Sequence, residues 1–161
     1  MPRMALLALL AACVSDAPAY FGGDYNIAVT ARENGCGFSG WTSGATATNI
    51  QLQLLQNAGS SDVTGTIQGG TGFVVQLLLG TNMLAGRVSG RTLEALLTGV
   101  KTLTQGTCQY NILVDVNGEL SGDVITGTID YTTRTNHAAD CGAIEGCHSF
   151  EDFNGTRPPS H

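Results

Sequence analysis

Residues 107–133 read TCQYNILVDVNGELSGDVITGTIDYTT, and this stretch has the clearest structural pattern in the chain. Apolar and polar side chains alternate on both sides of Gly122-Asp123, a two-residue turn signal. If the chain folds back there, residues whose numbers sum to 245 lie opposite each other. This register pairs apolar residues on one face: Val114 with Tyr131, Val116 with Ile129, and Leu120 with Ile125. A slip of one residue would invert both faces, so the sequence predicts an antiparallel hairpin in this register.

The same alternation extends through the chain and predicts an all-β fold. The expected strands are 24–30, 50–54, 63–67, 73–79, 83–89, 92–99, 107–121 and 124–133. Connections this short join antiparallel neighbours, so these strands form an up-and-down meander. About eight such strands close most easily into a small barrel, because closure removes the two sheet edges. The pattern also predicts that no helix longer than about ten residues lies between Asp24 and Thr133.

Two local regularities support the meander. Residues 86–93 repeat the pattern of residues 118–125, which predicts a second hairpin turning at Gly90-Arg91. Four glycines lie between apolar neighbours at expected inward positions, namely Gly65, Gly86, Gly118 and Gly127. Such glycines mark points where strands of a small barrel bend sharply. Alternatively, their missing side chains leave a cavity for an apolar ligand.

Eight meandering strands with apolar inward positions resemble the lipocalin-type barrels, some of which are bacterial lipoproteins. The resemblance implies a small closed barrel. Lipocalins carry a Gly-x-Trp at the start of the first strand, whereas the single Trp here, Trp41, follows the first strand directly after Gly40. No ligand-contacting residue is therefore carried over.

The start of the chain resembles a bacterial lipoprotein signal. Arg3 and a short apolar run lead into Leu10-Ala11-Ala12-Cys13, which is similar to a lipobox. The resemblance implies a signal peptide over 1–12, a lipid on the thiol of Cys13, a tether over 13–23, and a membrane-anchored protein of the cell envelope. An alternative signal, Ala17-Pro18-Ala19, would release a secreted or periplasmic protein. The barrel domain is expected over 24–157, with a tail at 158–161.

Composition narrows the possible partners. Without Arg3, six basic residues face thirteen acidic ones, a net charge of −7. Nucleic acid is not an expected partner, because no basic stripe could bind phosphates. An acidic domain is also repelled by anionic lipid surfaces, so we expect membrane attachment to come only from the lipid anchor.

Cysteine usage indicates an oxidising compartment. Apart from Cys13, the chain has four cysteines, an even number that can form two disulfides. Counting strands alternately up and down places Cys108 and Cys141 at one rim and Cys36 at the other. Cys147 reaches Cys36 if the C-terminal segment 136–157 climbs the barrel wall. We therefore predict Cys108–Cys141 and Cys36–Cys147, with Cys36–Cys108 and Cys141–Cys147 as the competing arrangement.

Polar residues of the segment 136–148 are the candidates for chemistry. His137, Asp140, Cys141, Cys147 and His148 could form a metal cluster, but five residues between the thiols exceed usual zinc spacing. A Cys147–His148 nucleophile pair would need a free thiolate and a third orienting group. We expect disulfides here, with no metal, cofactor or catalytic residue. Asp115, Glu119 and Asp130 are expected on the solvent side.

The sequence thus predicts a non-enzymatic envelope lipoprotein whose barrel is a binding or structural module, with an apolar small molecule as a possible ligand. The alternative is a small envelope hydrolase or metal-dependent enzyme centred on 136–148. Residues 73–79 are apolar on both faces apart from Gln76. They are expected either to be covered by 136–157 or to form a contact surface. The sequence indicates neither a ligand identity nor an oligomeric state.

Overall fold

The computed structural model describes residues 17–159 and consists of one closed antiparallel β-barrel. Eight strands form the barrel: β1 (Gly23–Asn34), β2 (Thr46–Gln56), β3 (Asp62–Ile67), β4 (Met83–Ser89), β5 (Thr92–Thr98), β7 (Cys108–Ser121), β8 (Val124–Thr135) and β9 (His148–Thr156). Each strand pairs with its neighbours along the chain, and β9 pairs with β1 to complete the circle. The up-and-down barrel predicted from the alternation is confirmed.

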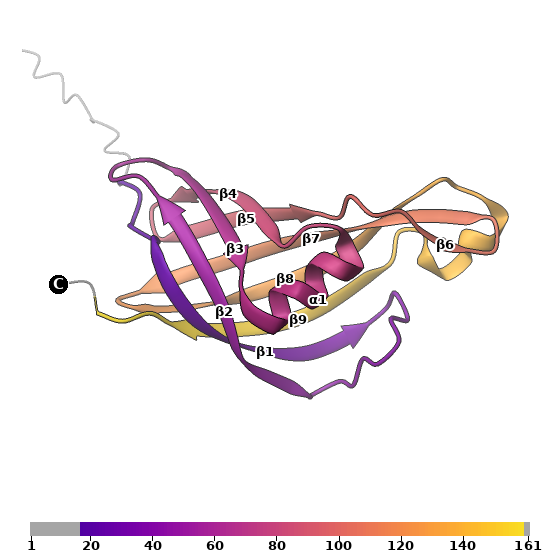
Figure 1. Ribbon diagram of the computed structural model, residues 1–161, viewed down its shortest axis with the longest axis horizontal. Coiled ribbons are helices and arrows are strands. Elements are labelled where there is room, and N and C mark those ends of the chain that lie inside the picture. Colours follow the sequence, from indigo (N-terminus) through magenta and orange to yellow (C-terminus); the bar gives the residue numbers. More distant parts are fainter. Residues whose placement is uncertain (1–16, 160–161) are drawn as a thin grey trace, which may run out of the picture.

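Three further elements are attached to the barrel (Figure 1). The helix α1 (Gly69–Leu79) connects β3 to β4, and the 3₁₀ helix η1 (Ala139–Ile144) connects β8 to β9. The strand β6 (Leu103–Gln105) pairs only with the start of β7. Neither helix within residues 17–159 is long and apolar enough to cross a membrane.

The hairpin β7–β8 has the predicted register. Its pairs run from Tyr110 with Thr135 to Ser121 with Val124, and all of them sum to 245. The hairpin β4–β5 repeats the geometry, with Ser89 opposite Thr92. Gly90 and Gly122, at the first position of the two turns, have φ of 56° and 62°. This left-handed conformation costs glycine little, because glycine lacks a Cβ.

The strand predicted at 73–79 is wrong, because this segment belongs to α1, an 11-residue helix. The expectation that no helix of this length occurs before Thr133 is wrong with it. Strands β3 and β4 pair directly, with Gly65 opposite Leu84, so no place between them is left for a strand. The connecting segment therefore satisfies its backbone groups internally as a helix. Gly80, with φ of 80°, ends it in the left-handed conformation.

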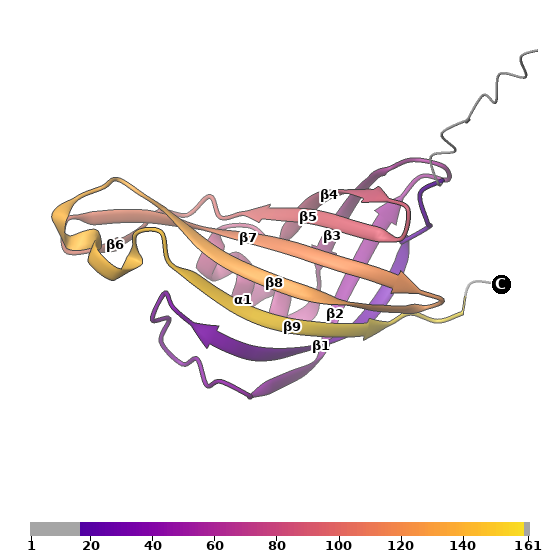
Figure 2. The same ribbon diagram turned by 180° about the vertical axis from the view of Figure 1, so that it is seen from behind.

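The eighth barrel strand is β9, which comes from the C-terminal segment expected to cover residues 73–79. It pairs with β8 on one side and with β1 on the other (Figure 2). The expected coverage is therefore wrong: Phe73 is 68% exposed and Leu77 is 59% exposed. The other alternative, a contact surface at these residues, stays a prediction.

Both predicted disulfides are confirmed, although the predicted positions of the cysteines are not. Cys36–Cys147 and Cys108–Cys141 each have a Cα–Cα distance of 4.9 Å. Strand β1 ends, β7 begins, β8 ends and β9 begins at one end of the barrel, so all four cysteines lie at the same rim. The expected separation of Cys36 from Cys108 and Cys141 arose from counting residues 73–79 as a strand.

Candidate functional site

The barrel encloses an apolar hollow, called the lumen here, with a volume of about 270 Å³. It is lined by inward side chains from strands around the whole barrel, including Ile50, Leu52, Ile67, Val116 and Ile129. These five side chains are only partly buried although they point inward. A barrel interior filled by side chains would bury them completely. The lumen is therefore a space bounded by aliphatic groups.

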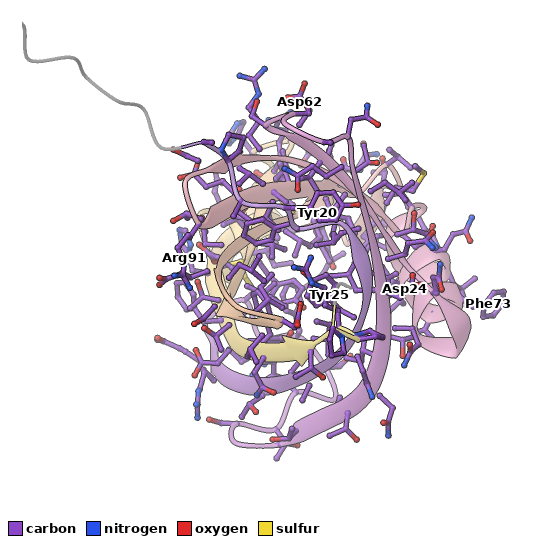
Figure 3. The ribbon with its side chains drawn as sticks, turned by 90° about the vertical axis from the view of Figure 1, so that its left-hand side faces the viewer. Tyr20, Asp24, Tyr25, Asp62, Phe73 and Arg91 are labelled. Atoms are coloured by element: carbon purple, nitrogen blue, oxygen red, sulfur yellow. A yellow bond between two sulfur atoms is a disulfide. The ribbon has the colours of Figure 1, made fainter. Side chains whose placement is uncertain are left out.

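One end of the barrel is sealed by aromatic side chains. Phe21 and Tyr25 are almost completely buried there, and Figure 3 shows Tyr25 in the middle of the barrel seen from this end. The Tyr25 hydroxyl donates to the Phe21 carbonyl at 3.0 Å, and the Phe21 N–H donates to Gln56 Oε1 at 2.6 Å. Residue Phe21, placed in the tether by the sequence, thus closes the floor of the barrel.

The buried side chain of Arg157 stabilises this closed end. Its guanidinium donates to the carbonyls of Tyr20 and Gly22, both at 2.8 Å, and pairs with Asp123 Oδ1 at 3.0 Å. The guanidinium also lies 5.6 Å from the ring centroid of Tyr25. Burial raises the pKa of the Tyr25 hydroxyl, and the Arg157 charge opposes the rise. The end opposite the disulfide rim is therefore closed.

At the disulfide rim a second hollow of about 570 Å³, called the mouth here, lies above the lumen. Its walls come from the loop after β1, from α1, from the start of β7 and from η1, and include Phe38, Trp41, Leu78, Tyr110 and Ile144. Val75 and Tyr131 line both the mouth and the lumen. Because they share these two residues, the mouth and the lumen are adjoining parts of one site.

The boundary between the two hollows carries a pair of polar side chains. Tyr131 on β8 donates its hydroxyl hydrogen to Glu151 Oε2 on β9 at 2.6 Å. Burial raises the pKa of the Glu151 carboxyl, while the hydrogen bond from Tyr131 opposes the rise. Burial and the neighbouring Glu151 charge raise the pKa of Tyr131 well above its usual value. Glu151 is thus the one charged side chain among the residues that line the lumen.

An aromatic cluster surrounds Tyr131 on its mouth side. The ring of Trp41 lies edge-to-face against Tyr131 at 5.7 Å between centroids, and Phe38 does so at 6.3 Å. Trp41 is positioned by its indole N–H, which donates to the Arg32 carbonyl at 3.2 Å. Edge-to-face contacts of this kind hold aromatic rings in defined orientations. Tyr131, one member of the polar pair, therefore also belongs to an aromatic cluster.

The inward glycines do not create the lumen. A Cβ on Gly65 would lie 2.7 Å from Leu84 Cδ1, and a Cβ on Gly118 would lie 3.2 Å from Phe153 Cζ. At Gly86 and Gly127 a Cβ would meet the backbone of the neighbouring strand. Adjacent groups thus occupy the space above these glycines, which favours the interpretation as close-packed bends. The lumen is lined instead by inward side chains, and none of the four glycines is among its lining residues.

The polar residues of segment 136–148 are not brought together. His137 pairs with Glu145, and His148 Nδ1 lies 2.9 Å from Asp130 Oδ2. Asp140 accepts from the Thr107 N–H and hydroxyl, and these hydrogen bonds lower the pKa of its carboxyl. Cys141 and Cys147 are in disulfides. Within residues 17–159, no three His, Cys, Asp or Glu side chains are grouped as metal ligands would be.

The acidic residues that were expected on the solvent side lie on the outer face of the barrel. Asp115 and Glu119 are exposed on the outside of β7. Asp130 is partly buried beneath His148 on the outer face. Cys13, the predicted lipidation site, lies outside the described residues.

Glu151 was not among the candidates from sequence. The sequence pairs Tyr131 with Val114 on the inner face, but it does not identify 148–156 as a strand. Residues 149–153 read Ser-Phe-Glu-Asp-Phe, in which apolar and polar residues do not alternate. The pattern becomes interpretable only with the pairing of Phe153 opposite Val29 and Gly127, which turns Ser149, Glu151 and Phe153 inward.

Comparison with known proteins adds no assignment: no protein-family model, no curated protein and no solved structure matches this chain.

Proposed function

We propose that this protein is a binding module that holds an apolar small molecule in the lumen, with entry through the mouth. The observation that carries the proposal is the aliphatic hollow of about 270 Å³ that adjoins the larger mouth. Small-molecule sites in proteins are usually concave, mostly apolar, and of roughly 300–1,000 Å³. A lumen and mouth of these sizes suit a slender apolar molecule better than a large polar one.

Rigidity supports the same proposal. The floor is closed by Phe21, Tyr25 and Arg157, and the opposite rim is held by two disulfides. A site held open by its scaffold loses little conformational entropy when a ligand enters. The alternative of an envelope enzyme centred on 136–148 draws no comparable support, because His137, Asp140 and His148 each pair with a different partner.

Filling the lumen tests the proposal. Val116 lines the lumen, opposite Ala95 and Ile129. Val116→Trp places an indole in this space and is expected to weaken binding of the uncharged apolar dye N-phenylnaphthylamine at least tenfold, since the dye and the indole compete for one volume. The measurement is a fluorescence titration of the dye with purified protein.

The matched control is Val124→Trp, because Val124 is exposed on the outside of β8. This variant adds the same indole without changing the lumen, so its dye affinity should equal that of the wild type. The circular dichroism spectra of both variants would show whether the barrel is retained. If the folded Val116→Trp variant binds the dye as tightly as the control, the lumen is not the binding site.

We further propose that the module works in a bacterial cell envelope, anchored by a lipid on Cys13. The four remaining cysteines are all in disulfides, as in exported proteins. In a bacterial host, Cys13→Ala should abolish labelling with a clickable fatty acid and move the protein from the membrane fraction to the soluble one. An unlabelled wild-type protein that begins at Tyr20 would instead establish cleavage after Ala17-Pro18-Ala19 and a soluble secreted form.

A further inference from the structure

The charge distribution inside the barrel selects the kind of ligand. Among the residues that line the lumen and the mouth, Glu151 is the one with an acidic side chain, and none is Lys, Arg or His. An anionic head group would therefore meet a carboxylate and no cation. A cationic head group would meet an opposite charge in a partly buried setting, where the attraction is stronger than in water.

The hydrogen-bonding capacity of the polar pair has the same bias. Tyr131 has one hydroxyl hydrogen, and it is given to Glu151 Oε2. The ionised carboxylate has only acceptors, and no described Lys, Arg or His lies within 4.0 Å of Glu151 as a salt-bridge partner. The pair thus offers acceptors to a ligand and no donor. A group with several N–H donors would complement it.

The aromatic cluster adds a third independent feature. The rings of Phe38, Trp41 and Tyr131 form one cluster, and Tyr131 is the member that is hydrogen-bonded to the carboxylate. All three line the mouth. The faces of aromatic rings attract cations, and Trp and Tyr do so more strongly than Phe. A carboxylate next to such rings is a combination that recognises ammonium groups.

We propose that Tyr131 and Glu151, backed by Trp41 and Phe38, form the head-group subsite of the barrel, and that the ligand is an apolar chain ending in a cationic amine. The chain lies in the lumen along Ile50, Leu52 and Val116, and the ammonium group lies at the boundary with the mouth. This inference rests on the proposed binding function and adds the class of ligand.

The test uses three ligands that share one chain and differ in the head group. Decylamine, decanol and decanoate are titrated into the full-length protein below the concentrations at which they form micelles. Binding is followed by displacement of N-phenylnaphthylamine at neutral pH. The amine is expected to bind at least tenfold more tightly than the alcohol, because its ammonium group adds an attraction between opposite charges that the hydroxyl of decanol lacks. Decanoate is expected to bind most weakly.

Two variants assign the preference to Glu151. Glu151→Gln keeps the size of the side chain but removes its charge, so the amine should lose its advantage over decanol. The control Glu119→Gln removes one charge from the exposed outer surface of β7 and should leave the amine preference unchanged. The control also separates binding at the subsite from general attraction of amines to an acidic protein.

The outcomes distinguish the two proposals. If all three ligands bind equally, or if decanoate binds most tightly, the head-group inference is wrong and the binding function stands. An amine preference that persists in Glu151→Gln, or that disappears in Glu119→Gln, also overturns the inference. If neither the dye nor any of the three ligands binds to the wild type, the binding function itself is wrong.

Discussion

Replacing Cys36 and Cys147 together by alanine is expected to lower the free energy of unfolding by about 4–5 kcal/mol. This disulfide joins residues 111 positions apart and ties the end of β1 to the start of β9. These are the two strands whose pairing completes the barrel. In the chain-entropy description, a long closed loop restricts the unfolded chain strongly, and removing the link restores that freedom.

The Cys108–Cys141 disulfide is the matched comparison, since its cysteines are only 33 residues apart. Replacing both by alanine should cost about 1 kcal/mol less than the first double substitution, because the closed loop is shorter. Urea denaturation of the two variants and the wild type measures the difference. A loss below about 2 kcal/mol for the Cys36 and Cys147 variant, or the reverse order of the two variants, would contradict this account.

Arg157→Met is expected to lower the free energy of unfolding by about 3 kcal/mol. The Arg157 side chain is 8% exposed and serves two backbone carbonyls and the Asp123 carboxylate. Methionine keeps much of the apolar stem but leaves these three acceptors without their donor. Asp123 is 33% exposed, so solvent compensates part of its loss and the expected cost stays below that of a fully buried pair.

The control is another Arg–Asp pair in the same barrel. Arg32 and Asp152 lie 2.6 Å apart on the outer surface, where their side chains are 53% and 48% exposed. Arg32→Met should therefore cost less than about 1 kcal/mol in the same denaturation experiment. Arg157→Lys should fall between, because one ammonium group does not reproduce a planar guanidinium that contacts three acceptors. Equal losses for Arg157→Met and Arg32→Met would show that Arg157 does not hold the closed end.

Much of the architecture is determined by local patterns in the sequence. Alternating side chains around Gly122-Asp123 specify the β7–β8 register, because the opposite faces of a strand are either buried or exposed. The same reasoning places the β4–β5 hairpin and the meandering order of neighbouring strands. The even number of cysteines after Cys13 likewise predicts two disulfides, although it does not place all four cysteines at one rim.

Tertiary pairing decides the remaining elements, and with them the site. Residues 69–79 become a helix because β3 and β4 already pair with each other. The sequence of the helix itself does not indicate this pairing. Residues 148–156 become a strand because β8 and β1 each present an unpaired edge. That pairing turns Glu151 inward next to Tyr131, which belongs to a strand 20 residues away in the sequence. Side-chain alternation is a local property, whereas the lumen and its carboxylate exist only where all eight strands meet.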